Sequence, residues 1–313
     1  MLDPVSLFSW EPHIDQRRLR ADTLVVTLGS FADAGHSQRL LNAHLLNQLP
    51  NRVVGRFDAD QVVDYAGRRP LIVFDGDHYA DYAQPGIDLH MVTDRDGKDF
   101  LLLTGPEPSL QWERMAASIA YVIEQTGVER VILAHAIPAG VPHTRRTSLT
   151  HYASDPSLLG EDRSPLGSFT MSASFSGVLT LRLGEAGHPV VGTVALVPHY
   201  IADSDYPDAA RTLVEGVRDA GRLALPTEGF ELPSAALHAQ LEQHRAGNED
   251  FAAHVAALEE AYDEARRDGS LSDAESASLP SADEIGAQVE EFLAGLQDEP
   301  RSDDDGPAGG DPS

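Results

Sequence analysis

One stretch decides the fold: Arg130-Val131-Ile132-Leu133-Ala134-His135-Ala136-Ile137-Pro138-Ala139-Gly140-Val141-Pro142-His143-Thr144-Arg145-Arg146. Its first half is a continuous apolar run, which is typical of a strand covered on both faces in a helix-flanked parallel sheet. In such sheets, ligands and partners gather at the carboxyl ends of the strands. Here that end carries imidazole, hydroxyl and guanidinium groups on a proline-stiffened backbone, so we expect the functional site there.

Strands and helices alternate on both sides of this stretch, up to about residue 224, which predicts a layered α/β domain. We expect further strands at 22–29, 52–57, 71–75, 178–183 and 190–197, and helices at 35–49, 109–127 and from Pro207 onward. Ser109 is expected to cap the second of these helices and Gly127 to end it. Asp94–Gly97 separates 87–93 from 100–103 as a hairpin, which makes the central sheet mixed.

The rest of the chain divides by composition. Residues 147–177 are rich in Ser, Thr, Gly and Pro, and we expect a long loop there that is a lid, a binding loop or partly disordered. After Pro226, amphipathic helices are expected at 234–244, 249–267 and 282–296, covering either the core or a second copy of the chain. The acidic, Gly/Pro-rich end is expected to be disordered. The predicted units are a core (1–225), a helical extension (226–296) and a tail (297–313).

Composition excludes several classes of function. The chain of 313 residues has no cysteine and a formal net charge of -27. The absence of cysteine excludes disulfides and thiolate metal sites and suits a reducing cytosol. The negative net charge argues against nucleic acid as a partner, because phosphate binding needs a basic surface. We expect neither a signal peptide nor a membrane-spanning segment.

Cofactor and metal signals are weak. Lys98 is the only lysine and lies beside a predicted turn, so a phosphate-loop lysine and a Schiff-base lysine are both missing. The first strand–helix loop lacks GxGxxG spacing, and no GxSxG motif is present. His135, His143 and His199 are the remaining metal candidates, but they lack ligand-pair spacing. We therefore expect no cofactor and no metal.

Four loops are expected to meet at the carboxyl end of the sheet. Glu107 could act as a base or pair with Arg145. Each loop also has a purely structural interpretation: Asp33 as a helix cap, Glu107 as an acid at a helix start, His143 in a loop-holding network, and Tyr200 in simple packing. Across these loops and the helix after the second, the predicted binding residues are Ser30, Asp33, Gly35, Glu107, Trp112, Pro142, His143, Thr144, Arg145, His199, Tyr200 and Tyr206.

The ordered set of loop motifs resembles the proteasome assembly chaperone 2 family, in its actinobacterial branch. The matching segments cover about residues 5 to 296. They are Gly29–Gly35, Phe57–Asp60 with Asp64-Tyr65 and Arg69-Pro70, Gly105–Pro108 with Trp112, Val141–Arg145, and Pro198–Tyr200 with Tyr206-Pro207 and Ala209-Ala210.

The resemblance implies a three-layer α/β/α core like that of the phosphorylase/hydrolase folds. It also implies a cytosolic protein that self-associates, with a trimer as one candidate state, and a proteasome-related protein partner. Eukaryotic and archaeal relatives often dock through a hydrophobic–tyrosine–any-residue tail, whereas this chain ends Gly310-Asp311-Pro312-Ser313. Docking by that mode is therefore not expected.

The leading hypothesis is a non-catalytic assembly or binding protein that acts through the strand-end loops and self-association. The alternative is a hydrolase or transferase on a small anionic substrate that uses Glu107, His143 and Arg145. Members of the family that the chain resembles are sometimes labelled ATP-dependent ligases. The single lysine argues against that activity, because ATP-grasp sites hold the phosphates of ATP with lysine side chains. A third hypothesis is a structural homo-oligomer without a separate ligand.

Overall fold

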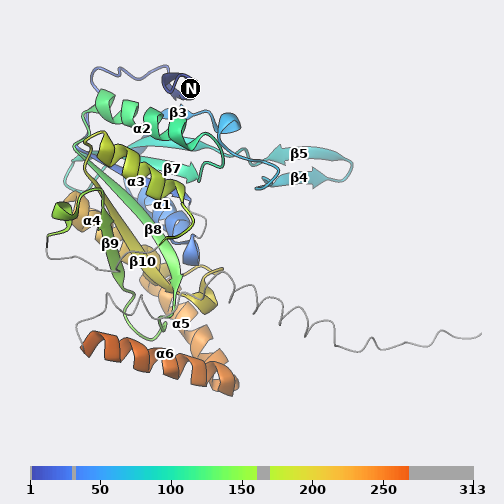
Figure 1. The fold of residues 1–313 in the computed structure, drawn as a ribbon. Helices are drawn as coiled ribbons and strands as arrows, with labels where there is room; N and C mark the ends of the chain where they lie inside the picture. Colours follow the sequence, from blue (N-terminus) through green and yellow to red (C-terminus); the bar gives the residue numbers. More distant parts are fainter. Residues whose placement is uncertain (1, 30–32, 161–169, 268–313) are drawn as a thin grey trace, which may run out of the picture.

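A computed structural model describes residues 2–29, 33–160 and 170–267 (Figure 1). Its centre is an eight-stranded sheet of order β1-β3-β6-β7-β2-β8-β10-β9. Neighbours among β7, β2, β8 and β10 run parallel, and the strands outside them pair antiparallel. The strands of this sheet are β1 (Phe8–Trp10), β2 (Thr23–Gly29), β3 (Asn51–Phe57), β6 (Ile87–Thr93), β7 (Asp99–Pro106), β8 (Arg130–Ala139), β9 (Leu149–Ala153) and β10 (Val190–Pro198).

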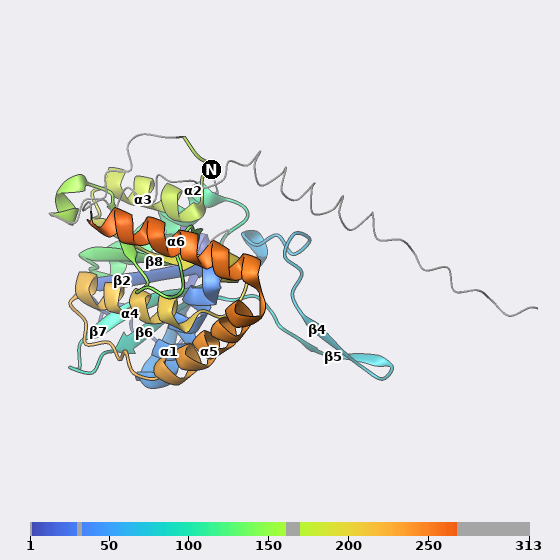
Figure 2. The same cartoon turned by 90° about the horizontal axis from the view of Figure 1, so that it is seen from below.

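Helices cover both faces of the sheet, and a helical pair lies beyond one end of it (Figures 1 and 2). One core joins α2 and α3 to the sheet, and the other joins α1 and α4 to its opposite face. The central strand β2 feeds both cores, because Leu24 and Val26 face one and Val25 the other. The helices are α1 (Ser37–Gln48), α2 (Trp112–Thr126), α3 (Phe175–Glu185), α4 (Pro207–Gly221), α5 (Glu231–Gly247) and α6 (Glu249–Arg267).

The predicted architecture is confirmed: a three-layer α/β/α core with a mixed sheet and a helical C-terminal part. Gly127 ends α2 in the left-handed conformation, as expected. Pro207 begins α4, and the predicted helix 249–267 is α6. The predicted helix 282–296 and the tail lie outside the described residues. Within the described part of the chain, no helix has both the length and the apolar composition needed to cross a membrane.

The strand predicted at 178–183 is wrong, because these residues belong to helix α3. Phe175, Leu179 and Leu183 are buried at a spacing of four, which places them on one helical face. The Ser174 side chain caps the helix by accepting a hydrogen bond from the backbone N–H of Gly177. A short apolar run does not distinguish strand from helix by itself, so packing against α2 decides.

The long loop predicted at 147–177 is also wrong in part. Leu149–Ala153 forms the edge strand β9, paired antiparallel with β10, and Pro156–Leu159 forms a short 3-10 turn. Every residue of β9 is half-buried, so it shows no alternation of buried and exposed positions. Residues 161–169 lie outside the described part.

Two smaller expectations need correction. Gln111, in a left-handed conformation, precedes α2, whereas the backbone N–H of Ser109 donates to Val62 O. The strand predicted at 71–75 exists as β4 (Ile72–Asp75), but it lies outside the central sheet, and its one partner strand among the described residues is β5 (His78–Tyr82). Its side chains are exposed, so its apolar composition does not come from burial in the core.

Gly192→Ala should destabilise the protein by about 1–3 kcal/mol, because the ring of Tyr152 already fills the space that the added methyl group would need. The Tyr152 ring of β9 lies across Gly192 of β10, and a Cβ there would sit 2.1 Å from Cζ of that ring. Urea unfolding followed by circular dichroism measures the change. Gly247→Ala is the control, because its Cβ would meet nothing within 4 Å. Equal stability of the two variants would contradict this packing.

Candidate functional site

The four parallel strands end side by side, as the site prediction requires. Gly29 of β2 pairs with Pro106 of β7, and Ala139 of β8 pairs with Pro198 of β10. The loops that follow these strands therefore start from one edge of the sheet. What each predicted residue contacts there is a separate question, because neighbouring loops can turn to opposite faces.

The first and fourth loops are joined by short backbone contacts. Gly35 N–H donates to Ala202 O at 2.6 Å, and Tyr206 N–H donates to Gly35 O at 2.9 Å. Gly35 has a φ of 66°, and a Cβ there would lie 2.7 Å from Cβ of the buried Tyr206. Only glycine satisfies both constraints at this position. These two predicted residues therefore set the spacing between the loops.

Asp33 caps helix α1. Its Oδ1 accepts from Gln38 N–H at 2.8 Å and its Oδ2 from Arg39 N–H at 3.3 Å. Burial raises the pKa of the Asp33 carboxyl, and the two backbone hydrogen bonds oppose this effect. The capping interpretation of Asp33 thus accounts for both of its oxygens. Ser30 lies outside the described residues.

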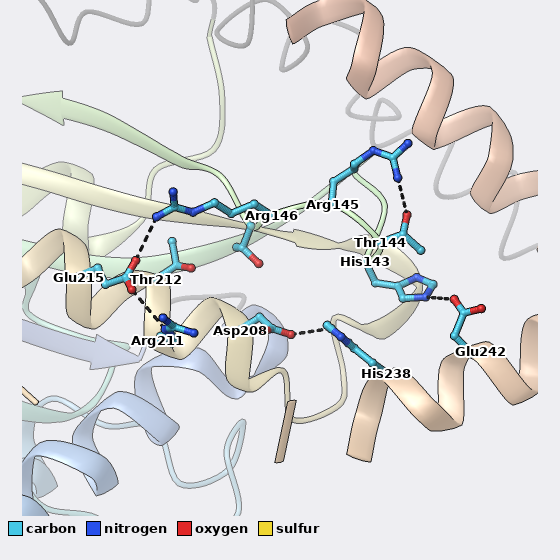
Figure 3. Close-up of a pocket in the computed structure, with 11 residues that line it drawn as sticks. His143, Thr144, Arg145, Arg146, Asp208, Arg211, Thr212, Glu215, His238 and Glu242 are labelled. Carbon is cyan, nitrogen blue, oxygen red and sulfur yellow. Dashed lines mark hydrogen bonds and ion pairs between the residues drawn. The ribbon is translucent and has the colours of Figure 1, made fainter. Parts of the chain in front are cut away.

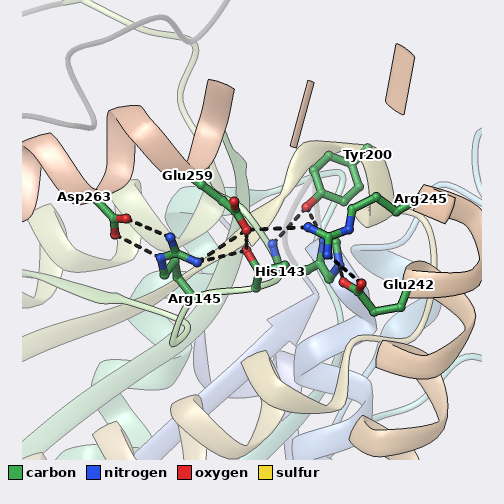
Figure 4. A network of polar contacts seen from close by, with 8 residues as sticks. His143, Arg145, Tyr200, Glu242, Arg245, Glu259 and Asp263 are labelled. Carbon is green, nitrogen blue, oxygen red and sulfur yellow. Dashed lines mark hydrogen bonds and ion pairs between the residues drawn. The ribbon is translucent and has the colours of Figure 1, made fainter. Parts of the chain in front are cut away.

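His143 and Tyr200 link the third and fourth loops. The backbone N–H of His143 donates to the Tyr200 hydroxyl at 2.9 Å, and His143 Nδ1 lies 2.7 Å from the same oxygen (Figure 4). His143 is only 3% exposed, and Pro142 beside it is buried. Burial lowers the pKa of His143, which Glu242 opposes. Burial likewise raises the pKa of Tyr200 to about 12. Both groups are therefore neutral near pH 7.

The C-terminal helical pair, α5 and α6, covers this loop cluster. Arg145 makes a two-pronged ion pair with Asp263 of α6, at 2.9 Å from Nε to Oδ1 and 2.7 Å from Nη2 to Oδ2 (Figure 4). Its Nη1 also lies 3.4 Å from Glu259, whose carboxylate accepts a hydrogen bond from the Thr144 hydroxyl. These predicted residues thus attach α6 to the loop after β8.

Aromatic contacts complete the covered surface. The Phe251 ring of α6 lies edge-on to Tyr200 at 5.3 Å and parallel to His143 at 6.4 Å between centroids. His199 Nε2 lies 3.2 Å from His254 Nε2, and partial burial lowers the pKa of His199. Two imidazoles at this distance share one hydrogen bond, with one nitrogen as donor. The helices of the extension therefore cover their own core here.

Glu107 and Trp112 contact a different neighbour, helix α3. The buried Glu107 Oε1 accepts from Phe175 N–H at 2.8 Å, and its Oε2 pairs with Arg68 at 3.4 Å. The Trp112 ring stands 6.1 Å from the Phe175 ring. Glu107 thus accepts from the first backbone N–H of a helix, as its structural interpretation predicts, but the helix is α3 and not α2. Glu107 and Arg145 take different partners, so Glu107, His143 and Arg145 do not form one constellation.

A polar groove of about 510 Å³ lies beside the loop cluster, between residues 143–147, α4 and α5 (Figure 3). Sequence reasoning identified only its His143, Thr144 and Arg145. It missed the residues on the helices, because helical positions give no motif; they are Asp208, Arg211, Thr212, Glu215, His238 and Glu242. An Arg211–Glu215 pair at helical spacing was the one available signal. No group of three or more His, Asp and Glu is arranged to hold a metal in the described part of the chain.

The chain belongs to the PAC2 family, whose family model matches residues 27–245. It is 35% identical to a Mycobacterium tuberculosis protein of unknown function, with a TM-score of 0.78 over 85% of this chain and 92% of that one. A Corynebacterium glutamicum protein of unknown function is 33% identical, with a TM-score of 0.76 over 83% and 97% of the two chains.

A more distant neighbour shares the fold. It is the Mycobacterium tuberculosis proteasome-assembly chaperone homologue, 22% identical, with a TM-score of 0.66 over 74% of this chain and 99% of that one. No protein of curated function matches the chain. The resemblance seen in the loop motifs is thus confirmed at the level of the family.

Arg145→Ala should loosen α6, because Asp263 then loses its two-pronged partner and Glu259 keeps only its contacts with Thr144 and Arg245. We expect amide exchange of residues 249–267 to accelerate by about tenfold, the equivalent of one charged hydrogen bond. Hydrogen-exchange mass spectrometry measures this. Arg182→Ala is the matched control, since Arg182 makes a similar two-pronged pair with Glu113 on the α2/α3 face. Equal exchange of α6 in both variants would contradict the attachment.

Proposed function

We propose that this protein is a non-catalytic, cytoplasmic binding factor that assists the assembly of a protein partner and works as a self-associated oligomer. Membership of the PAC2 family supports the class of function. Two structural neighbours are described as a proteasome-assembly chaperone homologue and an archaeal proteasome activator, at 22% and 10% identity. The proposed partner is therefore a proteasome-related protein.

One observation carries this proposal: an apolar arm extends away from the body of the protein. The β4–β5 hairpin projects into solvent in both views (Figures 1 and 2). Its large apolar side chains are 45% to 80% exposed; they are Leu71, Ile72, Val73, Phe74, Tyr79 and Tyr82. A two-stranded hairpin is at best marginally stable alone in water, and contiguous exposed apolar surface marks an interaction site.

A second copy of the chain is the occupant that we propose for the arm. Each copy would bury its own arm and cover another, which removes the exposed apolar surface from every copy alike. The edge-on contact of Phe74 and Tyr79, 5.2 Å between centroids, gives the arm a defined aromatic face. A trimer remains the candidate state.

The strand-end loops are proposed to bind the partner together with the outer face of the helical pair that they hold. The predicted binding residues have two tasks in this proposal. Gly35 and Tyr206 set the loop spacing and Asp33 caps α1, which together fix the loops, and Arg145 and Tyr200 hold α6 in place. His199 is exposed beside His254 and lies at the rim of this surface.

Replacing Phe74 and Tyr79 together by serine should dissociate the oligomer, because the apolar area that drives association is removed. Sedimentation velocity should show wild type sedimenting as an oligomer and the variant as a monomer. Leu232→Ser is the control, since Leu232 of α5 is 84% exposed but lies outside the arm. A monomeric wild type, or an oligomer unaffected by the arm variant, would refute self-association through the hairpin.

Partner capture tests the binding role. Tagged protein in native lysate should retain proteasome subunits, and Tyr200→Ala or Pro142→Ala should reduce that retention severalfold, because the loop and Phe251 lose their support. Quantitative mass spectrometry provides the readout. Leu110→Ser controls for a surface change elsewhere, since Leu110 is exposed beside α2. The role is rejected if nothing is retained, or if all variants retain the partner equally.

A further inference from the structure

Among the described residues, three buried polar atoms of side chains that line the groove between the loop 143–147, α4 and α5 lack an aligned hydrogen bond. They are His143 Nε2, Asp208 Oδ2 and His238 Nε2. The last two lie 2.8 Å apart but are not aligned as a hydrogen bond. His143 Nε2 lies 3.6 Å from Glu242 Oε1, which is too long for one. This wall therefore presents two histidine–carboxylate pairs, Asp208–His238 and His143–Glu242, that are not fixed by aligned hydrogen bonds, and such a wall suits a polar visitor.

The hydrogen-bonding character of this end follows from its neighbours. Tyr200 can donate its hydroxyl proton to His143 Nδ1, which leaves the proton of the neutral ring on Nε2, facing Glu242. Asp208 and Glu242 bring two carboxylates; Glu242 accepts from Arg245, and Asp208 lies 2.8 Å from His238 Nε2. This end of the groove is therefore acidic on balance, and it favours a cationic group that also donates hydrogen bonds.

The opposite end of the groove has the opposite charge. Arg146 and Arg211 share a single carboxylate, Glu215, at 3.4 Å and 3.2 Å (Figure 3). One acid between two guanidinium groups leaves a net positive charge. The two arginine side chains are 79% and 47% exposed, so they can reach an incoming anion. Arg145 also lines the groove, but Asp263 already occupies its fork. This end favours a carboxylate.

We propose that the groove binds a short zwitterionic peptide. Its terminal carboxylate would lie between Arg146 and Arg211, and its ammonium group would face Asp208 and Glu242. A cavity of about 510 Å³ is in the size range of small-molecule sites and exceeds the needs of one amino acid. This inference goes beyond the proposed function and does not depend on the oligomer or on the proteasome-related partner.

Isothermal titration calorimetry with trialanine tests the proposal on the full chain. We expect a Kd of about 1 mM or tighter for the unblocked peptide. N-acetyl-trialanine and trialanine amide each lose one charged end, and each should bind about tenfold more weakly. No binding of trialanine up to about 10 mM, or equal binding of the three peptides, would overturn the proposal.

Two variants assign the ends of the peptide. Arg146→Ala should weaken trialanine about tenfold and leave the amide unchanged, whereas Asp208→Asn should weaken trialanine and leave the N-acetyl form unchanged. Arg218→Ala is the matched control, because Arg218 lies on α4 but pairs with Asp219 outside the groove. Thermal unfolding without peptide confirms that each variant is folded. Binding by Arg146→Ala equal to that of wild type would reject the assigned orientation.

Discussion

Burial of polar groups at the carboxyl ends of the central parallel strands is the constraint on which the rest of the structure depends. Prolines and short turns place imidazole, phenol and guanidinium groups where the sheet ends, and burial, full for His143 and partial for Tyr200 and Arg145, favours a partner for each. The chain supplies most of these partners itself. Tyr200 serves His143, and Glu259 and Asp263 of α6 serve Arg145. The C-terminal helical pair is thus attached by polar contacts as well as by apolar packing.

This arrangement changes how a strand-end site is understood in this protein. In open α/β sheets the strand ends usually form a crevice that is free to bind ligands. Here α6 covers much of this crevice. The polar groove lies beside it and is lined by residues of α4 and α5. In the proposed function, macromolecules bind the outer face of the helical pair and the β4–β5 arm instead of the strand ends. Both regions are built on segments outside the central layers.

Local sequence patterns predicted most of the layered core. They failed where the same short apolar run fits either a strand or a helix, or either a buried or an exposed strand. Residues 87–103 contain a turn between two apolar runs, so the hairpin of β6 and β7 was predictable. Val178–Leu183 is too short for its periodicity to decide, and contact with α2 makes it helical. Leu71–Asp75 was recognised as a strand, but its composition does not reveal whether solvent, the core or another chain faces it.

The sequence by itself determined the alternation of strands and helices, the convergence of four polar loops on one sheet edge, and the family, because these depend on local patterns and ordered motifs. Only the tertiary structure decided which polar groups meet. Glu107 turned to α3 and Arg145 to α6, because the partner of a side chain depends on which face of the sheet its loop crosses. The groove could not be predicted from the sequence for the same reason, because its walls are helix faces that only folding brings together.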